Sequence, residues 1–258
     1  MNYKYITYYS DVPVGVITLN NPKKRNALSL ELLRELGRCL DIISADNNIK
    51  SVIIKAAGPV FSAGHDISEM ADKDLTFYNE VLNTCSSVML KIQNIPQPVI
   101  AQVQGIATAA GCQLVAACDL ALAEEGAMFG TPGVKLGLFC TTPAIPLVRA
   151  IGRKRALEML FTGRVIGARE AEHYGLINKA IPATDLETET LNLAKKIAEA
   201  SRLTLGIGKK SFYSQVNMID QQAYTYCNQV VVNNLFADDA KEGLHAFLEK
   251  RKPVWRNK

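Results

Sequence analysis

The sequence contains little cysteine, and its cysteines do not have the spacing typical of a metal or redox site. Six cysteines occur among 258 residues. The near pair Cys112 and Cys118 has neither a CxxC spacing nor neighbouring histidines. This pattern excludes a zinc site, a redox motif and a dense disulfide framework. We therefore expect free thiols, no bound metal and a reducing compartment, the cytoplasm.

The excess of positive charge is also small. Lys and Arg number 29 and Asp and Glu number 25, which gives a net charge of +4. A dedicated nucleic-acid-binding protein would show a clustered basic face, so we expect no nucleic-acid partner, whereas a small anionic ligand is compatible with this charge. Residues Met1–Tyr5 contain no basic segment followed by an apolar one, which predicts neither a secretory signal nor a transit peptide.

Charge is missing altogether from Ile92 to Cys118. A run of this length raises the question of a membrane-spanning helix. The run contains Pro96, Pro98 and several glutamines, which fit a buried strand, a turn and a short helix better than a helix that faces lipid. We expect no membrane span.

What the sequence does contain is a regular alternation of strands and helices. Hydrophobic residues make up 48% of the chain, and a chain of this length can bury a full core. Ser29 is placed to cap the first helix. The alternation predicts an α/β layer architecture with parallel strand pairing. The expected strands are 14–19, 51–56, 99–103 and 120–123, and the expected helices are 30–43, 75–91 and one that begins near Ala109.

The pattern changes after Pro182, where strand signals become rare. Apolar residues at helical spacing predict four helices, over 186–200, 205–215, 221–236 and 241–250. No Gly/Ser linker separates this part from the rest, and no sequence repeat is recognisable. We therefore divide the chain into an α/β core, residues 1–182, and a C-terminal helical region, residues 183–258, which packs against the core or another subunit.

Two loops combine small residues with a turn that directly follows a predicted strand. They are 61–67 (FSAGHDI) and 105–113 (GIATAAGCQ). Small side chains allow a ligand to approach the backbone, and the second loop begins a helix whose first N–H groups are unpaired. One backbone N–H group from each loop would form an oxyanion hole for a polarised carbonyl. The alternative is that the small residues only allow tight packing of helix on sheet.

Further short motifs accompany these loops along the chain. They are Asn21-Pro22, Asn26-Ala27-Leu28, Cys118-Asp119-Leu120, Phe129-Gly130-Thr131-Pro132-Gly133, Leu136-Gly137-Leu138, Gly152-Arg153, Leu160-Phe161-Thr162-Gly163, Gly175-Leu176-Ile177 and Glu242-Gly243 with Phe247 to Pro253. Each is weak alone. Together, and over essentially the whole chain, they resemble the crotonase (enoyl-CoA hydratase/isomerase) superfamily.

This resemblance implies a fold and a ligand. The fold would be the ClpP/crotonase-like spiral of ββα units with a C-terminal helical trimerisation region, assembled as a homotrimer or as a hexamer built from two trimers. The substrate would be a coenzyme A thioester, with no tightly bound cofactor. The oxyanion hole would use the backbone N–H groups of His65 and Ala110. The implied contacts to substrate and coenzyme A are Arg25, Ala27, Ser62, Ala63, Asp66, Ile67, Phe247 and Lys250.

The sequence departs from the family pattern at the acid–base residues. Hydratases of this family use two glutamates, because one group must accept a proton while the other donates one. In register with them stand Gln113 and Gly133. Gly133 is expected to leave room for a water or a bound anion, as in the naphthoyl-CoA synthases, where bicarbonate acts as the base. Cys140 is a candidate nucleophile, although a buried inert thiol is the favoured interpretation.

Three functional hypotheses follow. The leading one is an acyl-CoA-binding, nominal enoyl-CoA hydratase/isomerase of the lyase class in fatty-acid or acyl-CoA metabolism, with two-glutamate hydration in doubt. The second is a non-catalytic protein that binds acyl-CoA or responds to it. The third is a thioester hydrolase, or an enzyme of anion-assisted carbon–carbon chemistry. For Asp66, a role in holding its loop is favoured over a role in chemistry.

Overall fold

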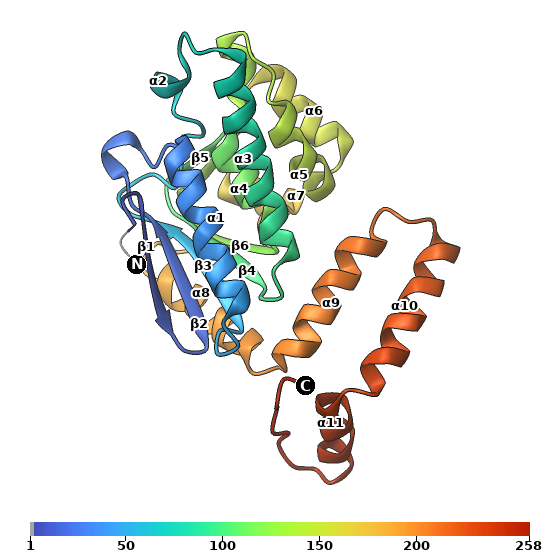
Figure 1. Cartoon of the computed structure of the whole chain (residues 1–258). Helices are drawn as coiled ribbons and strands as arrows, with labels where there is room; N and C mark the ends of the chain where they lie inside the picture. The colour runs from blue at the N-terminus through green and yellow to red at the C-terminus, as the bar shows by residue number, and fades with distance from the viewer. Residues whose placement is uncertain (1–2) are drawn as a thin grey trace.

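The computed structural model describes residues 3–258. Its central element is a six-stranded sheet (Figure 1). Its strand order is β1-β2-β3-β4-β6-β9. The first two strands pair antiparallel and all other neighbours pair parallel. The strands are β1 (Ile6–Asp11), β2 (Val14–Leu19), β3 (Ser51–Ala56), β4 (Val99–Val103), β6 (Leu120–Glu124) and β9 (Lys179–Ile181).

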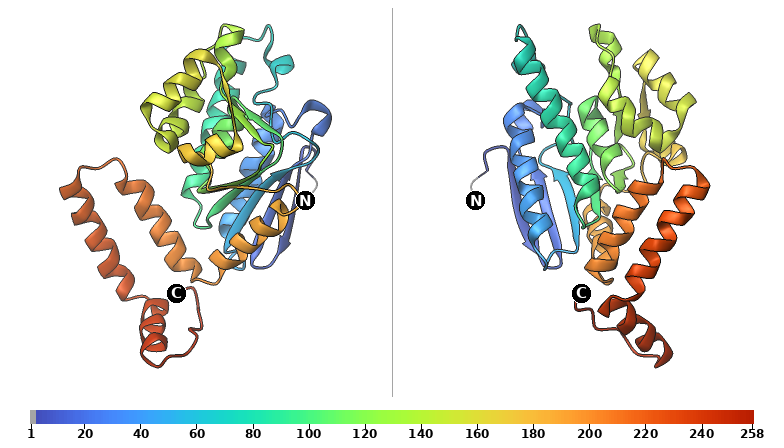
Figure 2. Two further views of the ribbon diagram at one scale, coloured as in Figure 1. Left: turned by 180° about the vertical axis from the view of Figure 1, so that it is seen from behind. Right: turned by 45° about the vertical axis from the view of Figure 1, so that its right-hand side comes forward.

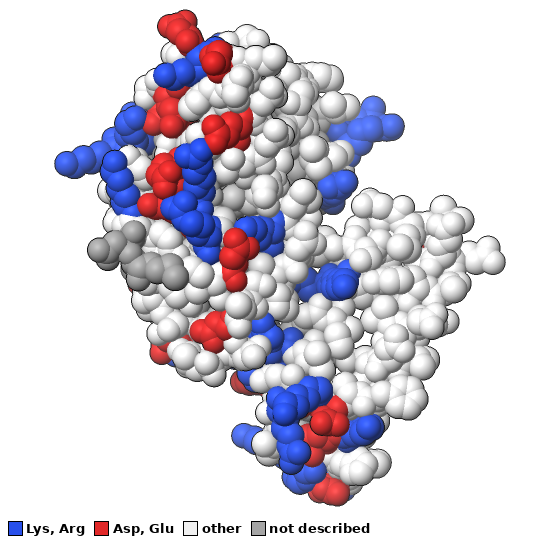
Figure 3. All heavy atoms as spheres, in the orientation of Figure 1, with Lys and Arg blue, Asp and Glu red and all other residues white. Residues whose placement is uncertain are grey.

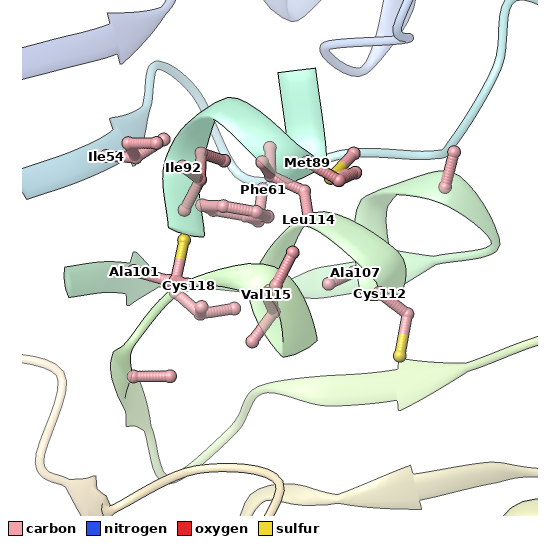
Figure 4. Packing of buried hydrophobic residues seen from close by; sticks show 14 of the residues in the cluster. Ile54, Phe61, Met89, Ile92, Ala101, Ala107, Cys112, Leu114, Val115 and Cys118 are labelled. Atoms are coloured by element: carbon pink, nitrogen blue, oxygen red, sulfur yellow. The ribbon is translucent and has the colours of Figure 1, made fainter. Parts of the chain in front are cut away.

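Successive strand residues point to opposite sides of this sheet, and the residues on both sides are apolar, so both faces are covered. In β2, Ile17 and Leu19 face a large core that includes α1 (Leu30–Ala45), α3 (Leu75–Asn94) and α4 (Ala110–Ala117). Figure 4 shows Phe61 and Leu114 in this cluster. Val14 and Val16 face the other side, where α8 (Leu186–Ala198) covers the sheet. The predicted parallel α/β core is therefore present.

The first predicted helices begin where the sequence places them. The Ser29 hydroxyl accepts a hydrogen bond from the Leu32 amide at 3.3 Å, and the Asp74 carboxylate accepts one from the Phe77 amide at 2.8 Å. These side chains satisfy N–H groups that the first turn leaves without partners. Capping therefore fixes the start of α1 and of α3.

A second, smaller sheet lies beside the first and carries the loops of interest. Its order is β5-β7-β8, and its strands are β5 (Ile106–Thr108), β7 (Met128–Gly130) and β8 (Val165–Gly167). The uncharged run thus contains β4, β5 and α4, and no helix among residues 3–258 is long and apolar enough to cross a membrane. The remaining short elements are η1 (Pro22–Lys24), α2 (Ile67–Met70), η2 (Pro132–Leu136), α5 (Thr141–Ile151), α6 (Arg153–Thr162) and α7 (Ala168–Tyr174).

The last three helices extend away from the core as an arm (Figures 1 and 2). They are α9 (Arg202–Gln215), α10 (Asp220–Leu235) and α11 (Asp238–Leu248). Few charged residues lie on α9 and α10 in the view of Figure 3, and Asp220 is the one charged residue within α10. Helix α8 packs on the sheet, and α9 begins the arm while it still contacts the core through Lys209 and Tyr213. The division at residue 182 stays a prediction.

Candidate active site

Glycine brings the two predicted loops into direct contact. The Ser62 amide donates to the Ile106 carbonyl at 3.2 Å, and the Thr108 amide donates to the Ser62 carbonyl at 3.0 Å. A Cβ atom on Gly111 would lie 2.4 Å from the Ser62 carbonyl oxygen, and one on Gly64 would lie 3.2 Å from the Ala110 nitrogen. A residue with a side chain at position 64 or 111 would therefore push the two loops apart. His65 follows Gly64 and Ala110 precedes Gly111, so the two residues are neighbours across the loops.

The helix that follows the second loop starts from a constrained residue. Ala109 has φ of 50°, a left-handed conformation that is unusual for alanine, and its amide donates to the Gly130 carbonyl at 2.9 Å. Within residues 3–258, neither the His65 nor the Ala110 backbone N–H donates to another group of the chain. Two free N–H groups at the positive end of α4 suit a developing oxyanion.

A third loop, residues 21–29, lies beside loop 61–67 and contains Arg25 and Ala27, two of the predicted coenzyme A contacts. The Asn26 side chain accepts from the Asn21 amide and donates to the carbonyls of Ala57 and Val60 at 2.8 and 2.7 Å. The Ser62 hydroxyl donates to the Asn26 carbonyl at 2.9 Å, and the Ala63 amide donates to the Arg25 carbonyl at 3.0 Å. The predicted residues Arg25, Ala27, Ser62 and Ala63 are thereby brought together.

Asp66 is engaged within its own loop. Its carboxylate accepts from the Ser68 amide at 3.1 Å, which caps α2, and from the Lys24 ammonium at 2.7 Å. Burial disfavours the charged carboxylate, but the hydrogen bonds from Lys24 and Ser68 outweigh that cost and hold the pKa below its ordinary value. This geometry agrees with the loop-holding role that we favoured. The next residue, Ile67, is half exposed.

The ring of His65 has one bonded and one free nitrogen. Its Nδ1 lies 3.3 Å from the Leu28 carbonyl oxygen, which can only accept, so Nδ1 carries the proton. Nε2 is then an acceptor, and it is enclosed without a partner among residues 3–258. Burial lowers the pKa of the ring and favours its neutral form.

The two positions predicted to replace the family glutamates, Gln113 and Gly133, have different surroundings. Gln113 is buried, and its Oε1 is enclosed and unpaired among the described residues. At Gly133 a Cβ atom would lie 2.7 Å from the Cys140 sulfur and 2.9 Å from the Leu138 carbonyl oxygen. A side chain at residue 133 would therefore meet the Cys140 thiol and the Leu138 carbonyl where it begins, and room for a water or an anion beside Gly133 stays a prediction.

Cys140 itself has the properties of an inert thiol. It is the residue before α5 and is buried. Burial raises its pKa, and a hydrogen bond with the Gly133 backbone only partly opposes this effect. A reactive cysteine needs a neighbour that lowers its pKa. The geometry thus favours a packing role over a nucleophilic one.

The last two predicted residues lie far from these loops. Phe247 is in α11 and is 82% exposed, and Lys250 follows that helix. Figure 1 shows α11 at the far end of the arm, whereas α2 lies at the opposite end of the molecule. A single chain does not bring Phe247 and Lys250 to its own loops.

One residue beside the site was missed by the sequence reasoning. Thr131 follows β7 directly, is 1% exposed, and has an enclosed hydroxyl without a partner among residues 3–258. A polar residue between a buried strand and Pro132-Gly133 is the signal that could have identified it. Across these residues, no group of three or more His, Cys, Asp or Glu is placed to hold a metal ion.

Comparisons with known proteins agree with the resemblance carried by the motifs. The sequence profile of the family described as "Enoyl-CoA hydratase/isomerase" matches residues 11–258. The human protein named "Enoyl-CoA hydratase domain-containing protein 3, mitochondrial" is 51% identical over 240 residues, 93% of this chain and 79% of that protein. The crystal structure of human enoyl Coenzyme A hydratase domain-containing protein 3 aligns with a TM-score of 0.96 at 48% identity, covering 98% and 100% of the two chains. An enoyl-CoA hydratase structure from Mycobacterium smegmatis aligns at 0.95 with 41% identity, covering 98% and 99%.

Proposed function

Because the chain belongs to the enoyl-CoA hydratase/isomerase family and has the crotonase fold, we propose that it binds an acyl-coenzyme A thioester between loops 61–67 and 105–113. The thioester oxygen accepts hydrogen bonds from the backbone N–H groups of His65 and Ala110. The observation that supports this most strongly is the contact of Gly64 and Gly111 with the opposite loop, which makes these two N–H groups neighbours. Loop 21–29 offers Arg25 and Ala27 to the coenzyme A part.

The chemistry available to this site is stabilisation of an enolate-like oxyanion. Hydration by two carboxylates needs a proton acceptor and a proton donor. An amide at Gln113 and a thiol beside Gly133 supply neither near neutral pH. We therefore assign the chain to acyl-CoA metabolism in the manner of a hydratase/isomerase whose ordinary hydration activity is very low.

A second candidate is a protein that binds acyl-CoA without turning it over. The observation in its favour is that packing, rather than chemistry, occupies the position of the second glutamate: the Cys140 sulfur would lie 2.7 Å from a Cβ on Gly133. The same observation weighs against anion-assisted chemistry. The raised pKa of Cys140 weighs against a hydrolase that uses this thiol as its nucleophile.

The proposed assembly is a homotrimer, alone or paired as a hexamer. Phe247 and Lys250 can serve a thioester site only if α11 of one copy reaches the loops of another. The arm also carries exposed apolar side chains that suit an interface, among them Phe236 and Leu248 at 72% and 77% exposure. The cytoplasmic location stays a prediction, and the named human relative is described as mitochondrial.

Calorimetry with a thioester and its thioether tests the proposal. Acetyl-CoA and S-ethyl-CoA differ in the carbonyl group that the two N–H groups would bind. We expect acetyl-CoA to bind about 30-fold more tightly, because two neutral hydrogen bonds each contribute on the order of 1 kcal/mol. Equal affinities would contradict the oxyanion hole. If none of CoA, acetyl-CoA and crotonyl-CoA binds, the proposed class of ligand is contradicted. Turnover of crotonyl-CoA at the rate of a two-glutamate hydratase would contradict the assigned chemistry.

A further inference from the structure

Charge is distributed unevenly over the surface of the core. Residues 126–157 contain five Lys and Arg and no Asp or Glu, although the whole chain has 29 Lys and Arg against 25 Asp and Glu. This segment runs from just before β7 to the middle of α6. In Figure 3 the surface over α5 and α6 shows Lys and Arg atoms and no Asp or Glu atoms, while acidic atoms gather over α1 and α3 and on the arm. The side of the molecule that carries α5 and α6 is therefore cationic.

Four of these five cations have no partner within the described chain. They are the exposed residues Lys135, Arg149, Arg153 and Lys154. Across residues 3–258, none of the four takes part in a hydrogen bond, an ion pair or a ring contact. The fifth cation, Arg155, lies over the Tyr174 ring at 4.3 Å, and the nearby Arg164 pairs with Glu158 and Glu170. Like charges without counter-charges repel one another, so the four unpaired side chains favour an anionic partner from outside the chain.

Large apolar side chains protrude from the same elements. Those with at least half of their surface uncovered are Leu136, Leu138, Ile145 and Phe161. The ring centroids of Phe139 and Phe161 lie 5.9 Å apart, which joins the residue before Cys140 to the end of α6. A Cβ on Gly163 would lie 3.1 Å from the Lys135 Cε, which joins η2 to the same end of α6. On α5, Ile145 and Arg149 are four residues apart and share one face of the helix. Apolar and cationic side chains are therefore interspersed on one surface, formed by η2, α5 and α6, which we call the basic face.

The partner that matches both kinds of side chain is an anionic lipid surface. Proteins bind at a membrane surface when apolar side chains enter the boundary between headgroups and acyl chains while Lys and Arg attract anionic lipids. The arm of a second copy matches less well, because Asp220 is the one charged residue within α10 and supplies little negative charge for four cations. A nucleic acid supplies phosphates, but it offers no apolar environment for Leu136 and Phe161.

We propose that the basic face docks on the surface of a membrane that contains anionic lipids. Leu136 and Phe161 enter the headgroup region, and the four unpaired cations bind lipid phosphates. Gly133 belongs to η2, so the docked face adjoins the proposed thioester site. The docking itself uses no thioester group and does not rest on the proposed function.

Vesicle flotation with the full-length protein tests the docking. One set of vesicles consists of phosphatidylcholine alone, and the other contains about 30% phosphatidylserine. We expect the protein to float with the anionic vesicles and to bind the neutral ones at least about tenfold more weakly, because each Lys or Arg near an anionic surface adds to the attraction. Raising the NaCl concentration from about 0.1 M to about 0.5 M should weaken binding to the anionic vesicles, because salt screens exposed charges.

Two variants separate the contributions of charge and apolar contact. Lys135→Glu with Lys154→Glu should weaken binding to the anionic vesicles by about 30-fold or more, because two attractions become repulsions. Leu136→Ser should weaken it by about tenfold, because a protruding apolar side chain no longer enters the headgroup region.

Matched controls carry the same changes elsewhere on the surface. Lys210→Glu with Lys252→Glu alters the net charge equally at two exposed positions, one in α9 and one in the C-terminal tail. Leu90→Ser removes a leucine that is 58% exposed on α3. Both controls should bind the anionic vesicles as the native protein does, and equal losses in the controls and the variants would contradict a role specific to the basic face.

The other outcomes are equally decisive. Failure of the native protein to float with the anionic vesicles would overturn the proposal. Native affinity in Leu136→Ser would also overturn it, since the face would then bind polyanions through charge alone. A smaller assembly of Leu136→Ser than of the native protein in light scattering would assign the face to contacts between copies of this chain. Acetyl-CoA binding is measured separately on the same protein, so a failure of docking is distinguished from a failure of the proposed function.

Discussion

At Gly133, the position predicted to replace the second glutamate, the Cys140 sulfur lies where a side chain would begin. Gly133 and Cys140 are a matched pair, because a side chain at residue 133 would begin 2.7 Å from the Cys140 sulfur. The absence of the carboxylate is thus built into the packing rather than being a single substitution. A glutamate at this position would meet both the Cys140 sulfur and the Leu138 carbonyl oxygen, 2.7 and 2.9 Å from its Cβ.

This packing predicts which variants gain hydration. Gln113→Glu with Gly133→Glu should hydrate crotonyl-CoA little better than the native protein, because the second glutamate has no room. Adding Cys140→Gly removes the sulfur and leaves a small shift of the Leu138 carbonyl, 2.9 Å away, to complete the fit. This triple variant should hydrate at least ten times faster than the double variant, since general acid–base catalysis contributes about 10²–10⁴-fold. The loss of crotonyl-CoA absorbance measures the rate, and circular dichroism checks the fold.

Cys140→Gly alone is the control for the triple variant and should show no gain, because it restores no carboxylate. Equally low rates in the double and triple variants, with both folded, would show that the thiol is not what prevents hydration. Equally high rates would show that loop 133–140 moves aside without cost.

At the scale of elements, α9 is joined to the core by a buried ion pair. The Lys209 ammonium donates to Asp119 at 2.6 Å and to the carbonyls of Ile92 and Gln97 at 2.7 and 2.8 Å. The Tyr213 hydroxyl donates to the other oxygen of Asp119 at 2.8 Å. Burial lowers the pKa of Lys209, and Asp119 opposes this effect. Every donor of the ammonium has an acceptor, which makes burial of the charge tolerable.

Removing one partner should therefore destabilise the protein strongly. Asp119→Ala leaves a buried ammonium with no counter-charge, for which a loss of about 3–5 kcal/mol in the free energy of unfolding is typical. Urea denaturation measures this loss. The double variant Asp119→Ala with Lys209→Met should recover much of it, because the charge goes as well. Lys196→Ala breaks the exposed pair with Glu199 and should cost no more than about 1 kcal/mol. Similar losses for Asp119→Ala and Lys196→Ala would contradict the anchoring role.

The C-terminal tail is held to α11 by a carboxylate. Glu242 accepts from Arg251 at 2.6 and 3.0 Å and from the Val254 amide at 2.9 Å. The hydrogen bonds from Arg251 lower the pKa of the Glu242 carboxyl from 4.5 to about 2. A carboxylate whose pKa is lowered by its partners stabilises the bound tail at pH values above its ordinary pKa. That stabilisation is lost as the pH falls towards the lowered pKa.

The single tryptophan reports on this contact. Trp255 donates through its indole N–H to the Glu199 carbonyl at 2.7 Å and packs on Gly243. We expect its fluorescence emission to shift to longer wavelength as the pH falls from 4.5 to about 2. Glu242→Gln should abolish that pH dependence, whereas Glu249→Gln, which removes a different partner of Arg251, should keep it. An unchanged transition in Glu242→Gln would assign the shift to another group.

The sequence predicted the elements with long periodic patterns and missed the short ones. The strands 14–19, 51–56 and 99–103 agree with β2, β3 and β4, and Ser29 caps α1 as expected. β1 was missed because its residues are mostly exposed and lack a clear apolar pattern. The three-residue strands β5, β7, β8 and β9 were missed because a strand this short has no measurable period. Pairing with a neighbouring strand, rather than local preference, makes these segments extended.

The sequence predicted which loops form the site, but it did not predict the space between them. Small residues after a strand indicated where Gly64 and Gly111 let two backbones meet. Nothing in the sequence shows that the Cys140 sulfur, seven positions further along the chain, returns to the side-chain position of Gly133. That contact depends on the path of loop 133–140, and side-chain packing between loops leaves no periodic signal. The unpaired hydroxyl of Thr131 was hidden for the same reason.

At the scale of the whole molecule, the arm of α9, α10 and α11 leaves large apolar side chains uncovered. Exposed fractions are 58% for Val231, 49% for Leu235 and 72% for Phe236 in and after α10. A patch of this kind marks an interaction surface. The same arm carries Phe247 and Lys250 away from the loops of their own chain (Figure 1). Assembly and ligand binding should therefore be coupled.

This coupling gives a prediction about assembly. Light scattering on the native protein should give a mass three or six times that of one chain, and Leu235→Asp should shift it to a monomer by placing a charge on the apolar face of α10. Val12→Asp, an equally drastic change at an exposed position in the β1–β2 turn, should leave the assembly intact. The monomeric variant keeps its own loops 61–67 and 105–113, yet it should bind acetyl-CoA about tenfold more weakly, a loss of about 1.4 kcal/mol, because it lacks Phe247 and Lys250 of a second copy. A monomeric native protein would refute the assembly, and unchanged affinity in a monomeric variant would show that each chain completes its site alone.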